Sequence, residues 1–410
     1  MKATSDDIKM LLAVAMFAAA TIAMASVPVV SNVSMAQDSS RRVTISYTLS
    51  EEPGIVTPDI LTNGVSIGEE NLSYFAGDVY RLVGTNGVHT ITWRPEKAWP
   101  GHRITDGSVS VKLTAWATNA PPPYMVVDLT MADTIRFYTS TNAFPEEGLA
   151  NPVYKTDRLV LRRIPAANVE WRMGSPTNEL GRTDAAEYPH YATLSEDFYI
   201  GIYELTQKQY VRIMGALPQT QQNAGDLYPM DKVSYNQLRG TDYVWPEGGH
   251  NVTANSFLGA LRTHACNIAF DLPTEAQWEY ACRAGCGSAL YTGEELIGKV
   301  TSANLDPIAV YKQNGGATTA VGIRMPNNWG LYDMIGSVWE LCLDWYEANY
   351  ENYDPETGPG FSSTAKRVIR GGGIGNSAAT QRCASRSSTS PTGQTGNGFR
   401  VCCSAIIPSK

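Results

Sequence analysis

Cysteine is absent before Cys266 in this 410-residue chain, and histidine is rare throughout it. Because all seven cysteines lie in the second half, the first half must be stable without disulfides. The cysteines include no CxxC pair, which disfavours a structural zinc site. The five histidines include no pair at i, i+4 spacing, which disfavours a histidine-based iron site.

Clusters of basic residues are also missing. The chain has 32 Lys and Arg against 40 Asp and Glu, which gives a net charge of −8. A protein that binds nucleic acid usually carries a basic patch, so no nucleic-acid partner is expected. Beyond the N-terminus, no apolar run reaches the roughly 20 residues of a membrane-spanning helix, so no transmembrane anchor is expected. At roughly 150 residues per domain, the length predicts two or three domains.

Residues 1–25 have the pattern of an export signal. Lys2 and Lys9 flank a short polar head, an apolar run covers residues 10–24, and small residues at 23–25 suit a cleavage site before Ser26. A membrane anchor is the alternative reading, but about 15 apolar residues are too few to span a bilayer. The sequence therefore predicts a signal peptide and a protein that is secreted or held in the cell envelope or periplasm.

Residues 26–140 are predicted to form an all-β domain. Polar and apolar residues alternate at 42–49, 90–93 and 108–116, and turn-forming dipeptides separate the runs. Short strands joined by such turns are typical of an antiparallel sandwich of immunoglobulin or fibronectin type. The segment 141–157 is rich in proline and small polar residues and is interpreted as a linker.

Residues 158–410 have the mixed pattern of an α+β domain. Strands are predicted at 168–175 and 198–205, and helices at 207–214 and 256–269. A third helix begins after Thr274, which forms a capping box with Gln277. Its apolar stripe is predicted to pack in the core.

Six motifs in this second part carry a family resemblance. They are Trp171-Arg172-Met173-Gly174, Glu187-Tyr188-Pro189-His190, Phe198-Tyr199-Ile200 with Glu204-Leu205-Thr206, Leu272-Pro273-Thr274-Glu275-Ala276-Gln277-Trp278-Glu279-Tyr280-Ala281, Asn328-Trp329-Gly330-Leu331-Tyr332-Asp333-Met334-Ile335-Gly336-Ser337-Val338-Trp339-Glu340, and Arg370-Gly371-Gly372 with Gly398-Phe399-Arg400. In this order they resemble the sulfatase-modifying-factor, or formylglycine-generating enzyme, domain. The resemblance implies a C-type-lectin-like α+β fold, here preceded by the all-β sandwich.

The resemblance also implies a test for catalysis. The aerobic enzymes oxidise a substrate cysteine with copper held by two cysteines shortly after a Gly-Gly-Ser. Here Gly373 holds the serine position, and no cysteine follows until Cys383, whose surroundings match a family cysteine outside the copper pair. Cys402 and Cys403 are no obvious substitutes, because neighbours on a strand point to opposite faces. We therefore expect the copper site to be missing.

Calcium is the ion that the resemblance favours instead. The family holds structural calcium with oxygen atoms that match Asp333, the carbonyl of Ile335 and the side chain of Ser337, and a second set lies near Asn304. Hard oxygen ligands on loops suit calcium. Ser337 stands where the family usually has asparagine, so the first set is altered.

Disulfides could also stabilise a domain with so much loop. Pairing Cys342 with Cys383 would tie an aromatic-rich segment to the C-terminal run. Pairing Cys282 with Cys402 or Cys403 would tie the third helix to the last strand. In the chain-entropy model each bridge would contribute about 3–5 kcal/mol.

The C-terminal run from Arg367 to Val401 is the candidate functional segment. Its two ends match the family motif, and between them lies a polar stretch. Small polar side chains supply adaptable hydrogen bonds. It also resembles the variable region of diversity-generating-retroelement target proteins that share this fold. We expect an exported module that binds a protein or surface ligand. The alternatives are a copper oxidase with a rearranged site, another enzyme on this fold, or a structural cell-envelope protein. The predicted binding residues are Asn376, Ser377, Thr380, Gln381, Ser385, Ser387, Ser388, Thr389, Gln394, Thr395 and Asn397.

Overall fold

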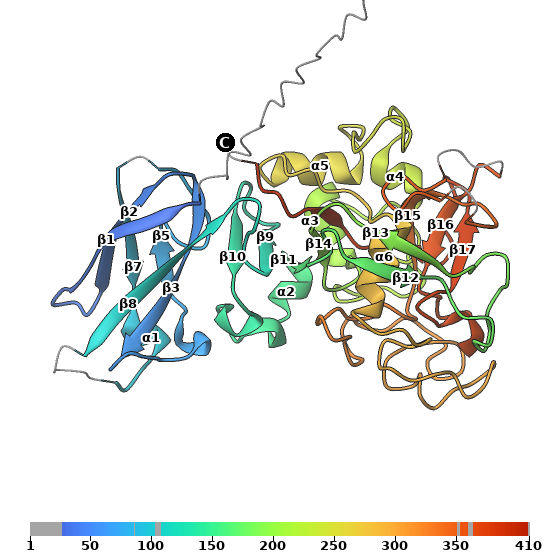
Figure 1. Ribbon diagram of the computed structural model, residues 1–410, viewed down its shortest axis with the longest axis horizontal. Helices are drawn as coiled ribbons and strands as arrows, with labels where there is room; N and C mark the ends of the chain where they lie inside the picture. Colours follow the sequence, from blue (N-terminus) through green and yellow to red (C-terminus); the bar gives the residue numbers. More distant parts are fainter. Residues whose placement is uncertain (1–26, 86, 103–107, 351–352, 360–363, 409–410) are drawn as a thin grey trace, which may run out of the picture.

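The computed structural model describes residues 27–85, 87–102, 108–350, 353–359 and 364–408. The predicted signal peptide at 1–25 lies outside the described residues. A β-sandwich occupies one end of the molecule and a mixed α+β body the other (Figure 1). Among the described residues, no helix is both long enough and apolar enough to cross a bilayer.

Two sheets form the N-terminal sandwich, with strand orders β1-β2-β7-β5 and β4-β3-β6, and β8 pairs with β3. Strand β2 alternates strictly, and its residues Val43, Ile45, Tyr47 and Leu49 are buried between the sheets. The strands are β1 (Val29–Gln37), β2 (Val43–Ser50), β3 (Gly54–Thr62), β4 (Val65–Ser66), β5 (Phe75–Gly77), β6 (Leu82–Val83), β7 (Val88–Trp93) and β8 (Val109–Ala117), with helix α1 (Pro95–Ala98) after β7.

The next two strands do not belong to the sandwich, which corrects the predicted boundary at residue 140. Strand β9 pairs antiparallel with β11 and β10, and these join β14 and β19 in one five-stranded sheet. The alternation of polar and apolar residues in β9 predicts a strand. It cannot predict which sheet that strand joins. The members are β9 (Tyr124–Asp128), β10 (Ile135–Tyr138), β11 (Arg158–Ile164), β14 (Phe198–Gly201) and β19 (Cys402–Ser404).

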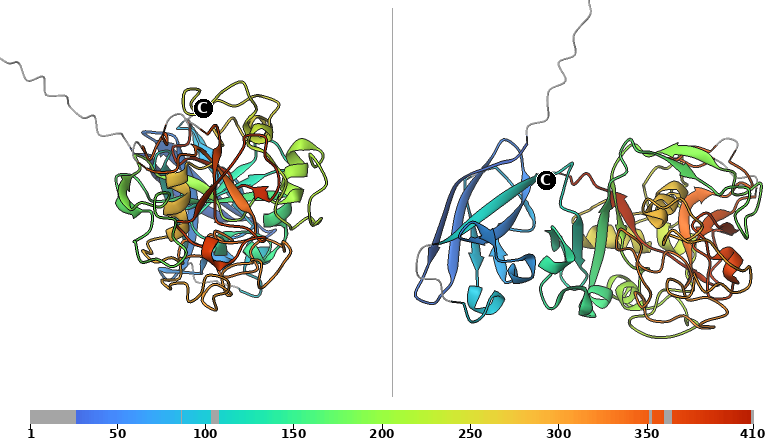
Figure 2. Two further views of the ribbon diagram at one scale, coloured as in Figure 1. Left: turned by 90° about the vertical axis from the view of Figure 1, so that its right-hand side faces the viewer. Right: turned by 60° about the horizontal axis from the view of Figure 1, so that its bottom comes forward.

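The predicted linker at 141–157 is folded. It contains helix α2 (Val153–Thr156), and the Tyr154 side chain is buried. The Tyr154 ring lies against that of Phe144 with centroids 5.0 Å apart, and its hydroxyl donates to the Pro145 carbonyl at 2.8 Å. Figure 2 shows this teal-green part of the chain between the sandwich and the remainder of the second body. The two bodies are therefore joined by packed structure.

Helices α3 and α6 confirm the helix predictions that rested on capping signals. Helix α3 spans Gln207–Met214, and α6 spans Glu275–Arg283 with the predicted Thr274–Gln277 capping box. The stripe of α6 is buried as predicted. The predicted helix at 256–269 is shorter, because α5 (Phe257–His264) ends before residues of positive φ at 266 and 267. A further short helix, α4, spans Tyr235–Arg239.

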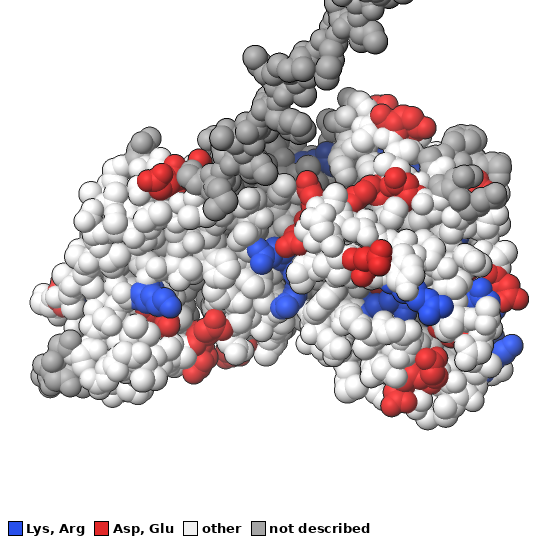
Figure 3. Space-filling view, in the orientation of Figure 1, with Lys and Arg blue, Asp and Glu red and all other residues white. Residues whose placement is uncertain are grey.

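The last sheet carries the C-terminal run. Its order is β17-β16-β15-β18, formed by β17 (Arg386–Thr389), β16 (Arg367–Arg370), β15 (Trp339–Trp345) and β18 (Asn397–Gly398). A separate hairpin pairs β12 (Glu170–Met173) with β13 (His190–Thr193). On the face that Figure 3 shows, acidic and basic side chains are interspersed.

Candidate functional site

The predicted C-terminal loop contains short pieces of regular structure. A short 3-10 helix covers Ala378–Thr380, and β17 pairs antiparallel with β16 so that Ser388 lies opposite Val368. The Arg-Ser-Ser-Thr sequence of β17 has no apolar alternation, so its pattern did not predict a strand. The polar run is thus mounted on a sheet whose other strands are buried.

Buried arginines fix the start of this run to helix α6. The Arg370 guanidinium pairs with Glu279 and lies 3.4 Å from Glu275, and it also donates to the Ser385 carbonyl at 2.6 Å. Arg386 pairs with both carboxylate oxygens of Glu275 at 2.7 Å. Both arginines are almost completely buried, so each acidic partner balances a charge that water cannot reach.

Two further arginines fix the middle and the end of the run. Arg382 pairs with Glu187 at 2.7 and 2.8 Å and also contacts Glu179. Arg400 pairs with Glu340 at 2.6 and 2.7 Å, and the same carboxylate accepts the Trp278 indole N–H at 2.7 Å. We call Arg370, Arg382, Arg386 and Arg400 with their glutamates the arginine frame.

The pKa values agree with a charged frame. Burial alone would raise the pKa of the Glu279 carboxyl, but Arg283 and Arg370 outweigh burial and hold its pKa below the ordinary value. Burial opposes the charge on Arg400, yet Glu340 raises its pKa above the ordinary value. Removing one member would leave the other as an uncompensated buried charge.

Three of the predicted binding residues belong to the interior, which corrects their assignment. Gln381, Ser385 and Asn397 are each at most 3% exposed. The Gln381 amide donates to the Gly373 carbonyl at 3.0 Å, and the Asn397 amide donates to Thr389 Oγ1 at 3.2 Å and the Gly393 carbonyl at 3.0 Å. Polar composition suggested surface residues, but the Gln381 and Asn397 amides donate to backbone carbonyls instead.

The other predicted residues are partly or fully exposed and form two groups. One group, which we call the β17 surface, lies along an edge strand whose successive side chains point to alternate faces. It consists of Ser387, Ser388, Thr389, Gln394 and Thr395. The Gln394 side chain accepts from the Gln219 amide at 2.7 Å, which fixes one edge of this surface. The second group, the η4 surface, consists of Asn376, Ser377 and Thr380.

Trp339 lies between the two surfaces, and sequence reasoning assigned it no role. Its backbone N–H donates to the Gly396 carbonyl at 3.1 Å, and its indole N–H donates to Asn376 Oδ1 at 2.9 Å. The side chain is only partly buried. A Cβ on Gly373 would lie 3.0 Å from the Trp339 ring, so glycine at the serine position suits this close approach. The only sequence signal was an aromatic residue inside a family motif.

The cysteines do not form the predicted disulfides. The structure contains neither predicted bridge, and Cys282, Cys342, Cys383 and Cys402 are thiols in it. The Cys282 side chain is in hydrogen-bonding contact with Cys383, and the Cys402 thiol lies 3.7 Å from Gln277 Oε1. The predicted pairs Cys342–Cys383 and Cys282–Cys402 are therefore not the cysteines that lie together. Which cysteines lie together depends on contacts between segments far apart in the sequence. Burial raises the pKa of the Cys282, Cys342 and Cys402 thiols.

A buried acidic cluster lies at the predicted calcium position. Ser337 Oγ donates to Glu204 Oε2 at 2.8 Å, and Asp333 Oδ2 accepts from the Gly322 N–H at 2.6 Å. Burial raises the pKa of the Asp333 carboxyl to about 6, and burial together with the Asp333 charge raises the pKa of Glu204 well above its ordinary value. The Lys155 ammonium donates to the Val321 carbonyl at 3.0 Å, and burial lowers its pKa.

These residues do not fit a calcium cage. Asp333 and Ser337 are engaged by protein partners, and Asn304 donates instead to Glu294 and to the Glu295 carbonyl. Within the described parts of the chain, no three His, Cys, Asp or Glu side chains gather where they could hold a metal ion. Glu204 was recognised only as part of a motif.

Comparisons with known proteins agree with the motifs. Residues 162–405 match the family described as the sulfatase-modifying factor enzyme 1-like domain. A formylglycine-generating enzyme of Streptomyces coelicolor is 37% identical over 150 residues, which cover 34% of this chain and 48% of that protein. The serine/threonine-protein kinase pkn1 of Chlamydia pneumoniae is 31% identical over 212 residues, covering 50% of this chain and 32% of that protein. The chain thus spans half or less of the length of these relatives.

Two solved structures are also similar. PvdO from Pseudomonas aeruginosa is 22% identical with a TM-score of 0.49, and the match covers 60% of this chain and 94% of that one. Treponema denticola variable protein 1 is 26% identical with a TM-score of 0.46, covering 60% of this chain and 95% of that one. The region matched by the family contains the arginine frame and both polar surfaces.

Proposed function

Since the chain belongs to the sulfatase-modifying factor enzyme 1-like family, we propose that it is an exported binding module that uses the β17 and η4 surfaces rather than an oxidase. Its fold follows the family, and its η4 surface follows Gly373 in the segment where the resemblance places the reactive cysteines of the family's oxidases. The partner is a protein or another surface ligand that is recognised mainly by hydrogen bonds.

One observation carries this proposal: the segment between Gly373 and Gln381 contains no thiol. Copper in such a site needs two accessible thiolates. Five of the seven cysteines are buried, and Cys266 and Cys286 are partly buried at other positions. Burial also raises the pKa of Cys286, which disfavours its thiolate. Copper chemistry at this segment is therefore unsupported.

The geometry instead suits binding. Hydroxyl and amide groups on the β17 surface are held by a sheet whose base is the arginine frame, so they lose little conformational freedom when a partner docks. Trp339 adds an amphipathic aromatic side chain between the two surfaces, and such residues are frequent at interfaces. The uncharged character of both surfaces favours a polar, neutral partner surface.

Catalysis is tested by incubating the purified chain with copper, oxygen and a peptide containing the CxPxR sequence. We expect no aldehyde by hydrazide labelling and mass spectrometry, whereas a formylglycine-generating enzyme run in parallel converts the peptide. Aldehyde formation by this chain would overturn the proposal in favour of the family's oxidase activity.

Export rests on residues 1–25. N-terminal sequencing of the protein from fractionated cells should find a chain that begins at Ser26 outside the cytoplasm. A cytoplasmic protein that retains Met1 would contradict this part of the proposal and leave the binding surfaces unaffected.

A further inference from the structure

A cavity of about 480 Å³ lies where the sandwich meets the second body. Five separate parts of the chain line it: Pro53, the turn and strand around Leu82, edge strand β10 with the residues just before it, the segment from Cys266 to Ile268, and the C-terminal residues around Ile407. A volume of this size is typical of small-molecule sites, which occur preferentially at domain interfaces. The cavity is distinct from the surfaces proposed above.

Regular structure holds the walls in place. Leu82 belongs to β6 and is paired with Ile55 of β3. The Phe137 N–H of β10 donates to the Tyr80 carbonyl at 2.7 Å, which joins the two bodies at the cavity. The Ile407 N–H donates to the Thr118 carbonyl at 2.8 Å. The cavity is therefore preformed and would not need to fold around a ligand.

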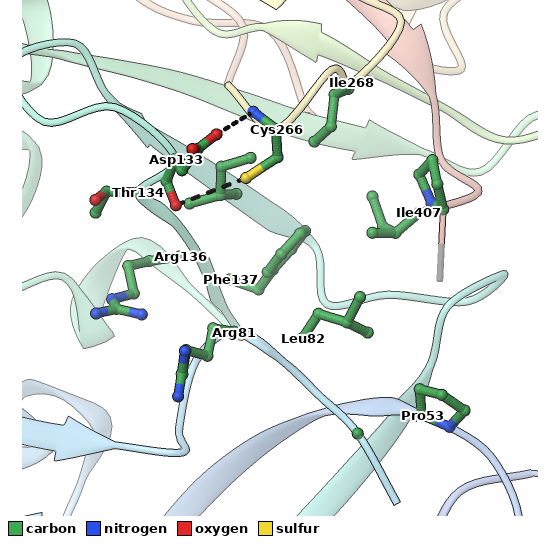
Figure 4. Close-up of a pocket in the computed structure, with 13 residues that line it drawn as sticks. Pro53, Arg81, Leu82, Asp133, Thr134, Arg136, Phe137, Cys266, Ile268 and Ile407 are labelled. Carbon is green, nitrogen blue, oxygen red and sulfur yellow. Dashed lines mark hydrogen bonds between the residues drawn. The ribbon is translucent and has the colours of Figure 1, made fainter. Parts of the chain in front are cut away.

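The lining is divided into an apolar part and a cationic part. In Figure 4, the side chains of Phe137, Leu82, Pro53 and Ile407 lie on one side, and Arg136 and Arg81 lie together on the other. Phe137 and Ile407 are almost fully buried, whereas Leu82 is partly exposed. A ligand that fills this cavity would meet hydrocarbon on one side and positive charge on the other.

One of the two positive charges in the lining is not balanced. Arg81 pairs with Asp78. The Asp133 carboxylate, also in the lining, accepts the Cys266 N–H at 3.0 Å just after the end of α5. Arg136 is partly buried and makes no hydrogen bond or ion pair with the described residues. Its guanidinium presents donors that suit a carboxylate.

From this arrangement we propose that the cavity binds a small amphipathic carboxylate, with the apolar body against Phe137, Leu82 and Ile407 and the carboxylate on Arg136. The apolar body gains by leaving water, and a carboxylate on a guanidinium forms stronger hydrogen bonds than a neutral group. Because both bodies contribute walls, the bound ligand also strengthens their junction.

The test is a fluorescence titration of the purified full chain with 11-(dansylamino)undecanoic acid and, separately, with its methyl ester. We expect saturable binding of the acid, and binding of the ester that is about tenfold weaker because the charge-assisted hydrogen bond is lost. Arg136→Met should weaken the acid about tenfold and leave the ester unchanged.

A matched control uses Arg172→Met, which removes an exposed arginine of β12 outside the cavity and should bind the acid like the wild type. Arg136→Lys keeps the positive charge. It should therefore bind the acid more tightly than Arg136→Met and less tightly than the wild type. No saturable binding of the acid, equal affinity for acid and ester, or an unchanged affinity in Arg136→Met would each overturn the proposal.

Discussion

Two parts of the same C-terminal run behave in opposite ways. The arginine frame is buried and ion-paired, and each of its four arginines is held by a glutamate from another part of the chain. The β17 surface, whose strand begins at Arg386, is partly exposed and carries no charge. Adjacent residues therefore follow different constraints: one set holds the fold and the other is available to a partner.

Under the proposed function, this difference explains how the family fold persists when the cysteines of the family's copper site are replaced. The frame residues contact helix α6 and the motifs around Glu187 and Glu340, so losing any of them disturbs the core. The segment around Asn376 contacts mainly backbone and the Trp339 indole. Its reactive residues can be replaced while the frame keeps the fold.

The largest effect is expected from breaking the frame. Arg370→Met should lower the free energy of unfolding by about 3–5 kcal/mol, because Glu279 and the Ser385 carbonyl each lose a buried charge-assisted hydrogen bond, although Glu279 keeps Arg283 and Glu275 keeps Arg386. Urea unfolding followed by tryptophan fluorescence measures the loss. Arg172→Met on exposed β12 is the control and should change stability by less than about 0.5 kcal/mol.

The frame should also respond to pH through Asp344, whose carboxylate accepts the Glu275 N–H at 2.6 Å. Burial, with the Glu275 charge, raises the pKa of Asp344 to about 7. Because an unfolded aspartate has a pKa of about 3.9, the folded state holds this proton more tightly, and the stabilisation is complete below about pH 4 and lost as the pH rises through 7.

The Asp344→Asn variant removes that titration. Relative to this variant, the wild type should lose on the order of 3 kcal/mol of stability between pH 4 and pH 8. Unfolding curves at several pH values measure the difference. Parallel pH profiles of the two proteins would show that Asp344 does not titrate in this range.

A smaller loss of stability is expected from a substitution at Gly372, which lies between Arg370 of the arginine frame and the polar run. Gly372 has a φ of 77°, and a Cβ there would lie 2.6 Å from Gln381 Oε1 and 2.7 Å from the Thr380 carbonyl oxygen. Gly372→Ala should therefore cost about 1–3 kcal/mol. Gly375→Ala is the matched control, because nothing lies within 4 Å of its Cβ position. Equal losses in the two variants would show that the turn is not tightly packed.

The β17 surface should tolerate change. Ser388→Ala should alter stability by less than about 0.5 kcal/mol. Asn397→Ala, which removes two buried amide hydrogen bonds from the same run, should cost about 1–2 kcal/mol. Thermal and chemical unfolding of both variants test the contrast, and a costly Ser388→Ala would place Ser388 in the frame.

The smallest effect is expected from chelation. Because Asp333 and Ser337 are engaged by Gly322 and Glu204, EGTA should leave the melting temperature unchanged. Thermal unfolding in calcium and in EGTA provides the test. A clear rise in melting temperature with calcium would instead support the ion that the family resemblance implies.

Local signals in the sequence predicted local structure well. The capping residue Thr274 and the stripe of α6 are decided within a few positions, and the structure contains both. Strand partners are decided at long range, so the sequence could not place β9 in the second sheet or bring Cys282 to Cys383. Composition also gave a wrong prediction for Gln381 and Asn397, which were expected at a binding surface. A polar side chain can donate to a buried backbone carbonyl as well as to a partner.

The most direct test of the account is a scan of all substitutions at residues 376–397, sorted by resistance of the folded chain to protease. The account predicts that Ser387, Ser388 and Thr395 accept nearly every residue except proline, whereas Arg382, Gln381 and Asn397 accept very few. Uniform intolerance across the run would contradict it, because the β17 surface would then be part of the core rather than a surface available to a partner.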